Sequence, residues 1–348
     1  MEIRIYNQEM ALLGIIENQT SLIWLRKYYT CGEFELHAPI TPDNLRMLRK
    51  ENLIFKRGSM EAGIIEDLTY DEEIVTTEIV AKGRFLSAYM DRRLIKSTVT
   101  IRDTAEKAMR TLLSRAVAIP RVELGALAGY AQRVDFQATY KNLLEYESKI
   151  ARASGLGFRF RPDFSAKKII FEVYAGIDRS ASQGINSRVI FSEAYNNLNH
   201  STYRYNSQLY YNVAYVGGEG EGSARKYVQV GSASGLALRE MFVDAKDIRQ
   251  EEGVSDAAYL ELLRQRGRER LAQNVEMESF AADTGADINF IYRQDYDLGD
   301  IVTVKKQGWN ITQDFRITEL KEVYEFGGMK VEPTFGDPLP EKIIWKDE

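Results

Sequence analysis

The chain has 348 residues, of which 44% are hydrophobic and 28% are charged, with a net charge of −5 and a pI of about 5.5. This composition is typical of a soluble globular protein with about two to four domains. It argues against a protein that binds nucleic acid by neutralising phosphates, and the single cysteine, Cys31, excludes an internal disulfide.

The first 96 residues are predicted to be β structure with one short helix. His37 lies on the polar face of the fourth predicted strand, where apolar and charged residues alternate. Thr41 and Pro42 are typical of a helix start, because a threonine side chain caps free amides and proline fits the first helical position. We expect Leu45 and Leu48 to be the buried positions of this helix. The predicted strands are residues 2–6, 15–18, 21–25 and 33–37.

Residues 97–200 are predicted to form an inserted α+β domain. Asp103 and Glu106 have the spacing of a capping box, and apolar residues recur at helical spacing after them. A second helix is expected from about Thr139 to Ala153, ending at Gly155. Two short strands, residues 158–160 and 169–174, follow as a hairpin.

From Tyr203 onward the pattern returns to β structure. A strand over residues 209–216 is expected to pair with residues 226–230 across a glycine-rich turn. A helix is expected to start at Ser255 or Asp256 and to end at about Asn274. Residues 341–348 are predicted to be an extended tail.

A segment near the start of the chain recurs near its end. Each copy reads as three strands joined by two turns, and an acidic residue precedes a leucine in each middle strand, at Asp67 and Glu319. Each copy also ends on glycine, at Gly83 and Gly336. The recurrence predicts a duplicated barrel-like module, with chance similarity between two β meanders as the alternative. The copies are residues 52–58, 63–68 and 77–83, and residues 300–305, 315–320 and 329–336.

Taken together, these patterns predict a mainly β protein with α+β insertions and two related β-barrel-like domains. The predicted domains are residues 1–96 (first barrel), 97–200 (inserted domain), 201–340 (second barrel, with a helical insertion at about 245–275) and 341–348 (tail).

No motif for a metal site or a catalytic triad is found in the sequence. A zinc site needs three or four ligands at set spacing, and the chain offers only His37, His200 and Cys31 besides carboxylates. A triad would have to use one of these two histidines, and no nucleophile elbow surrounds any serine. We therefore predict no catalytic, cofactor-binding or metal-binding residues and no cofactor.

Two further features have a structural and a functional interpretation. The run Gly217–Gly222 lacks the Gly-Lys-Ser/Thr ending of a phosphate loop and is better interpreted as a hairpin tip. The helix segment Arg264–Arg270 could contact RNA or a membrane, but Glu261 and Glu269 lie among its arginines. A solvated face or a subunit salt-bridge surface is therefore favoured.

Several runs of the sequence, spread over nearly the whole chain, resemble a family of siphophage tail proteins that is similar to the baseplate hub of contractile tails. The order and spacing of these runs carry the resemblance. They are Thr30–Pro39, Ala62–Glu66, Ala81–Leu86, Asp91–Arg93, Leu238–Ala245, Asp297–Val302 and Ile317–Leu320.

The resemblance implies a trimer in which each subunit carries two related β-barrels, so that three copies present six similar units to a sixfold tail tube. It also implies a DNA channel, and as partners the distal tail, tail tube and tape-measure proteins. Larger members add a C-terminal peptidase, lysin or fibre-like region. This sequence ends at Glu348, soon after the second unit, so we carry over no enzymatic activity and no receptor binding.

We therefore expect a structural protein of a phage or prophage tail tip: a hub ring that caps the tube, links it to distal tail and fibre proteins, and opens for DNA. The chain would be made in the bacterial cytoplasm, because residues 1–6 lack the apolar core of a signal peptide and no stretch approaches the roughly 20 apolar residues of a membrane span. We expect no sequence-specific contact with nucleic acid.

Two other classes of protein remain as alternatives. A cell-wall glycan hydrolase would use paired carboxylates such as Glu240 and Asp244; acidic residues also cluster at Asp247 and at Asp295, Asp297 and Asp300. A carbohydrate-binding module would expose aromatic rings, for instance Trp24, Trp309 or Trp345.

Overall fold

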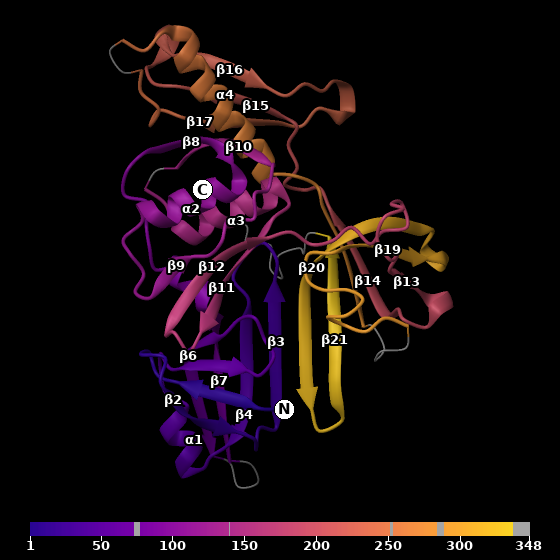
Figure 1. Cartoon of the computed structure of the whole chain (residues 1–348). Coiled ribbons are helices and arrows are strands. Elements are labelled where there is room, and N and C mark those ends of the chain that lie inside the picture. The colour runs from indigo at the N-terminus through magenta and orange to yellow at the C-terminus, as the bar shows by residue number, and fades with distance from the viewer. Residues whose placement is uncertain (73–76, 139, 251–252, 284–288, 337–348) are drawn as a thin grey trace.

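The computed structural model describes residues 1–72, 77–138, 140–250, 253–283 and 289–336 (Figure 1). Its N-terminal part has the predicted β pattern and short helix. Thr41 Oγ1 accepts a hydrogen bond from the Asn44 amide, as predicted for the cap of α1. Leu48 is buried, but the prediction for Leu45 is wrong, because the helix turns Asn44 and Met47 inward instead. The elements are β1 (Ile3–Tyr6), β2 (Leu12–Ile16), β3 (Ser21–Lys27), β4 (Glu33–Pro39), α1 (Pro42–Met47), β5 (Leu53–Lys56), β6 (Gly63–Glu72), β7 (Thr77–Phe85) and the 3-10 helix η1 (Leu86–Met90).

The next segment contains the two predicted helices and the predicted hairpin. Helix α3 starts where the Asn142 side chain accepts from the Glu145 amide, and it ends at Gly155, whose left-handed backbone favours glycine. The predicted capping box is wrong, because Glu106 instead accepts hydrogen bonds from the amides of residues 128–130. The elements are β8 (Val99–Thr104), α2 (Ala105–Arg115), β9 (Val122–Leu124), β10 (Arg133–Ala138), α3 (Leu143–Ser154), β11 (Gly157–Asp163) and β12 (Lys168–Tyr174).

The C-terminal part is β structure with one long helix, which the Ser255 side chain caps as predicted. The strand expected over residues 209–216 begins only at Val213, because Tyr210 closes a turn with Ser207. The tail and Trp345 lie outside the described residues. The strands are β13 (Ile190–Ser192), β14 (Asn199–Asn206), β15 (Val213–Gly217), β16 (Tyr227–Val230), β17 (Glu240–Asp244), β18 (Met277–Asp283), β19 (Ile301–Lys306), β20 (Ile311–Glu325) and β21 (Gly328–Gly336), and the helix is α4 (Asp256–Gln273).

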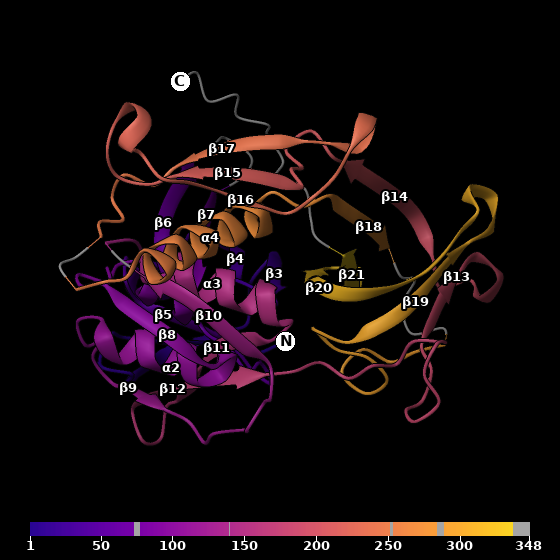
Figure 2. The ribbon, with the colours of Figure 1, turned by 90° about the horizontal axis from the view of Figure 1, so that it is seen from above.

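Most strands join one thirteen-stranded sheet that includes both ends of the described chain. Its order is β14-β18-β21-β20-β3-β4-β7-β6-β5-β1-β2, with β19 pairing to β20 and β13 to β19. Strand β3 therefore lies directly beside β20 near the centre of the molecule (Figure 1). Strands β15–β17 form a separate small sheet, and α4 packs on it (Figure 2).

The two parts of the large sheet share one topology. In the N-terminal half the spatial order is β3-β4-β7-β6-β5, and in the C-terminal half it is β14-β18-β21-β20-β19. Both are antiparallel throughout, with the first, second, fifth, fourth and third strands in succession. This agreement confirms the predicted recurrence of the β unit.

A β-bulge lies at the same place in both middle strands. The pairing of β6 with β7 shifts between Ile65 and Asp67, and that of β20 with β21 shifts between Ile317 and Glu319. The acidic residue and leucine noted in the sequence follow each bulge directly. The two terminal glycines are not equivalent, however: Gly83 pairs with Ile65, whereas Gly336 lies one residue beyond the partner of Ile317.

The buried side chains of the described residues form three clusters. The largest extends from Ile3 to Val173, so the N-terminal half of the sheet and the segment with α2 and α3 share one core. The second cluster fills the C-terminal half, and the third lies between α4 and β15–β17. No described helix has the length and apolar character that a bilayer crossing requires.

Candidate functional site

The junction between the halves is an antiparallel ladder of β3 with β20, from Leu22 opposite Tyr324 to Lys27 opposite Glu319. Alternate residues of β3 are buried, which places Trp24 and Arg26 on the core face of the sheet. An arginine on the face that contains a fully buried tryptophan must find partners, because an isolated buried charge is costly.

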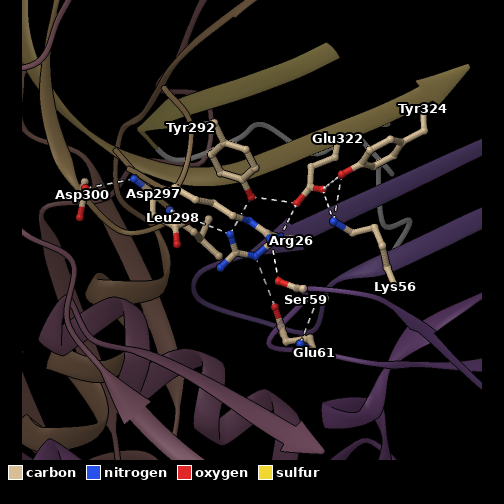
Figure 3. Close-up of polar contacts among 12 residues, drawn as sticks. Arg26, Lys56, Ser59, Glu61, Tyr292, Asp297, Leu298, Asp300, Glu322 and Tyr324 are labelled. Atoms are coloured by element: carbon tan, nitrogen blue, oxygen red, sulfur yellow. Dashed lines mark hydrogen bonds and ion pairs between the residues drawn. The ribbon is translucent and has the colours of Figure 1, made fainter. Parts of the chain in front are cut away.

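Arg26 finds its partners in the other half of the chain (Figure 3). Its Nη1 donates to the Tyr292 hydroxyl at 2.7 Å and to Asp297 Oδ1 at 2.5 Å. Its Nε lies 3.7 Å from Glu61 Oε2, which comes from the turn between β5 and β6. Arg26 thus connects a strand of the first half to the loop that precedes β19.

Glu322 of β20 is the second centre of the network (Figure 3). It is completely buried, and Lys56 Nζ donates to its Oε2 at 2.5 Å. The Tyr324 hydroxyl donates to the same oxygen, while Tyr292 and Arg293 donate to Oε1 at 2.8 and 3.0 Å. Tyr292 therefore accepts from Arg26 and donates to Glu322, so the two centres form one chain of hydrogen bonds.

The network balances three cations against three carboxylates. Burial disfavours the charged form of Glu322, but Lys56 and Arg293 outweigh this effect and lower the pKa of Glu322. Burial lowers the pKa of Lys56 and raises the pKa of Glu61. Burial also opposes the charge on Arg26, yet its neighbours hold its pKa well above the usual value. The cations are Arg26, Lys56 and Arg293, and the carboxylates are Glu61, Asp297 and Glu322.

The opposite face of the junction is a shallow acidic hollow of about 900 Å³. Charged side chains stand out from neighbouring strands and pair across them, as Lys82 does with Glu35 and Lys321 with Glu332. Six carboxylates and three cations line the hollow: Glu33, Glu35, Glu66, Asp67, Glu319 and Glu332 against Lys82, Arg84 and Lys321. This face of the sheet is therefore negative.

A larger cleft of about 1730 Å³ adjoins the hollow and has a basic wall formed by α3 and α4. Burial and repulsion from Lys149, Arg270 and Arg266 lower the pKa of Lys141. The arginines of α4 form ion pairs within the chain: Arg266 with Asp247, and Arg264 and Arg268 with Glu261.

The candidate carboxylate pair of the hydrolase alternative does not fit glycosidase geometry. Glu240 and Asp244 lie at opposite ends of β17, about 13 Å apart at the usual rise of a strand. Glycosidases place their two carboxyl groups about 5 to 9.5 Å apart. Asp244 also forms an ion pair with Arg225, which ties the end of β17 to the turn between β15 and β16.

The other acidic cluster stabilises loops. Asp300 accepts from the Ile177 amide and from Arg179, and Asp295 accepts from the Ile291 amide. Asp297 belongs to the junction network described above. The cluster therefore fixes the loop that brings Tyr292 to the junction.

The remaining candidates for a metal site or a catalytic triad are His37, His200 and Cys31. His37 lies between Glu35 and Glu78 at 2.8 and 2.9 Å, and burial raises the pKa of Cys31 to about 12. The side chain of His200 lies outside the described residues. Within the described part of the chain, no group of three or more His, Cys, Asp and Glu residues is arranged to hold a metal.

Of the aromatic candidates for glycan binding, Trp24 is completely buried and does not fit that role. Trp309 is half-exposed, and Lys306 lies over its ring. The glycine run Gly217–Gly222 ends β15 and forms the predicted turn toward β16.

Sequence reasoning missed the junction network. One available signal was Arg26, which continues the buried alternation of Leu22 and Trp24, and another was Lys56, which ends an apolar strand. Neither signal identifies the partner, because Glu322 lies 266 residues from Lys56.

Solved structures with a similar fold include prophage tail proteins. They include the 43 kDa tail protein of prophage MuSo2 from Shewanella oneidensis (TM-score 0.58, 13% identity, 96% of this chain and 98% of that chain). The prophage tail protein gp18 from Listeria monocytogenes EGD-e (TM-score 0.55, 13% identity, 97% and 95%) and the tail protein from Neisseria meningitidis MC58 (TM-score 0.55, 13% identity, 96% and 96%) are similar as well. A search of curated proteins gave no significant match.

The fold is thus that of phage tail proteins, which agrees with the fold class expected from the sequence. Residues 2–337 match the family of Siphovirus ReqiPepy6 Gp37-like proteins, and the chain belongs to that family. The family match confirms the siphophage resemblance carried by the sequence runs.

Proposed function

We propose that this protein is the hub of a phage or prophage tail tip, where three copies form a ring that caps the tail tube. The observation that supports this proposal most strongly is the repeated topology within one chain, with the same strand order and the same bulge in both halves. Three chains with two such units each would present six similar units, which suits docking on a sixfold tube. The role is structural rather than enzymatic.

Each region of the chain has a task in this proposal. Residues 1–96 and 201–340 would be the two ring units, each closing as a barrel in the assembly, and residues 97–200 would be the inserted domain. The buried network of Arg26 and Glu322 would hold the two units of a subunit at a fixed angle, because its hydrogen bonds join both halves. A fixed angle is what a closed ring requires.

The acidic hollow supports a channel for DNA. A wall that carries Glu33, Glu35, Glu319 and Glu332 would not hold passing phosphates by charge neutralisation. We propose that this face of the sheet lines the channel and that the outer surfaces contact the distal tail, tail tube, tape-measure and fibre proteins. The chain would act at the tail tip of the virion.

The proposal is tested by imaging particles in which this chain carries a compact label. Labelled density at the distal end of the tail is the expected result, with the unlabelled particle as control. Label that is confined to the head, or particles that lack the chain altogether, would refute a tail-tip role.

A further inference from the structure

The pairing of β20 with β3 has a counterpart in the repeat that is not formed within the isolated chain. In the repeat, β6 holds the place of β20, and β14 holds the place of β3. Among the described strands, β14 pairs only with β18, and residues 67–72 of β6 pair only with β7. The chain therefore offers two free edges that correspond to the two sides of its own internal junction.

The bulges fix the alignment of β6 with β20. Asp67 and Glu319 each follow the bulge directly, so Tyr70 corresponds to Glu322, three residues further on. Thr69 then corresponds to Lys321.

Cross-strand partners fix the alignment of β14 with β3. Phe34 of β4 is the partner of Gly83, which pairs with the residue just before the first bulge. Phe280 of β18 is the partner of Phe335, which pairs with the residue just before the second bulge. Phe34 and Phe280 are therefore equivalent, and both are buried. Their partners on the next strand are Trp24 and Tyr203. Arg204 and Tyr205 therefore correspond to the next two residues of β3, Leu25 and Arg26.

The junction residues and their counterparts at the free edges differ in solvent exposure. The junction residues are buried: Trp24 (0% exposed), Arg26 (3%) and Glu322 (0%). Their counterparts are open aromatic side chains: Tyr203 (38%), Tyr205 (53%) and Tyr70 (52%). Exposed aromatic residues on a strand with a free edge are typical of a surface that another strand covers.

We propose that β6 of one copy pairs antiparallel with β14 of the next copy, with Tyr70 opposite Tyr203 and Thr69 opposite Arg204. This proposal rests on the ring proposed above and assigns the residues of its subunit contact. The register follows from the internal ladder, in which Glu322 lies opposite Trp24 and Lys321 opposite Leu25. Because the two edges differ, the contact is heterologous, and in the proposed ring its repetition would close after three copies.

Side-chain chemistry favours this register. Arg204 would lie diagonal to both Asp67 and Asp71 of the neighbouring copy, a spacing at which long side chains still meet across strands. These three residues are exposed, and they form no ion pair within the described part of the chain. The tyrosines would stack across the contact on the opposite face.

Cysteine crosslinking between two tagged forms of the full chain tests the register. One form carries Thr69→Cys, the other carries Arg204→Cys, and the tags differ in size. Mild oxidation or a short bismaleimide should link the two forms, because directly opposite strand positions bring Cβ atoms close enough for a bond. The matched control replaces Arg204→Cys with Tyr205→Cys, whose side chain points to the other face of the sheet. Cys31 is buried and should stay unmodified.

The experiment is done with the purified protein at its highest soluble concentration and again with purified particles. In both samples, the Thr69→Cys and Arg204→Cys forms should give about tenfold more crosslinked mixed dimer than the Thr69→Cys and Tyr205→Cys control forms. A chain that carries both substitutions should give a ladder that stops at three copies. Equal yields from both pairs in particles that hold the chain at the tail tip would overturn the pairing and leave the hub role standing. Specific linking of a chain that is absent from the tip would keep the pairing and overturn the hub role.

Discussion

Lys56 and Glu322 come from opposite halves of the chain, and their charged groups lie 2.5 Å apart in the core of the sheet junction. Both side chains are almost completely shielded from solvent, at 4% and 0% exposure. Each is therefore costly to bury alone, and the pair stabilises the junction only while both members are present.

Removal of either member should destabilise the protein strongly. Lys56→Met leaves Glu322 buried without its nearest cation, and Glu322→Gln leaves Lys56 and Arg293 without their carboxylate. We expect each substitution to lower the free energy of unfolding by about 3–5 kcal/mol, measured by urea denaturation.

The matched control is Lys321 with Glu332, an ion pair between β20 and β21 on the exposed face of the sheet. Alanine at either position should cost about 0–1 kcal/mol, because solvent screens exposed pairs. A junction variant as mild as these controls would show that the buried network does not hold the halves together.

Glu147 should make the folded state less stable as the pH rises. Its carboxyl is fully buried on α3 and has no hydrogen-bond partner among the described residues, and burial raises its pKa well above the usual value. The folded chain therefore keeps a proton that the unfolded chain loses above about pH 4.3, so stability falls from there toward the raised pKa.

Glu147→Met should remove this pH dependence and increase the free energy of unfolding at pH 7 by about 1–3 kcal/mol. Chemical denaturation at pH 4 and pH 7 measures both effects. Glu145→Met on the exposed side of the same helix is the control. Equal changes at the two positions, or a loss of stability at Glu147, would contradict this prediction.

Gly83 should tolerate no side chain. A Cβ there would lie 1.8 Å from the carbonyl oxygen of Ile64 beside the β6 bulge. Gly83→Ala must displace backbone and should cost about 3 kcal/mol or more. Gly308→Ala, where a Cβ meets nothing within 4 Å, should change stability by less than about 1 kcal/mol in the same thermal melts.

His37 should titrate above the ordinary histidine range. Burial lowers its pKa, but hydrogen bonds to Glu78 and Glu35 outweigh this and raise it. The folded state therefore binds this proton more tightly than the unfolded state. The resulting stabilisation is complete below about pH 6.5 and is lost as the pH rises through the raised pKa. NMR titration of the His37 ring should show a higher midpoint in the original protein than in a double variant with Glu35→Gln and Glu78→Gln. Equal midpoints would show that the two glutamates do not raise the pKa of His37.

Local chemistry made much of the fold predictable. Thr41 before Pro42 and Ser255 before the long helix mark helix starts, and the alternation in β4 places Phe34 in the core. The recurrence of an acidic residue before leucine marked the two equivalent middle strands, and in both of them that acidic residue directly follows a bulge.

Long-range pairing was not predictable in this way. Nothing around Arg26 specifies Tyr292 or Asp297 as partners, since they lie at least 266 residues away and meet it only through the pairing of β3 with β20. Glu106 shows the same limit at shorter range. Its carboxylate accepts hydrogen bonds from backbone amides of the loop at residues 128–130 instead of capping the start of its own helix. Tertiary contacts override local preference in both cases.

The number and arrangement of copies at the tail tip test the central claim most directly. Averaged images of particles that carry one label per chain should show three labels related by threefold rotation at the distal end of the tube. Six labels, one label, or labels repeated along the tail shaft would contradict a hub in which each chain supplies two equivalent units.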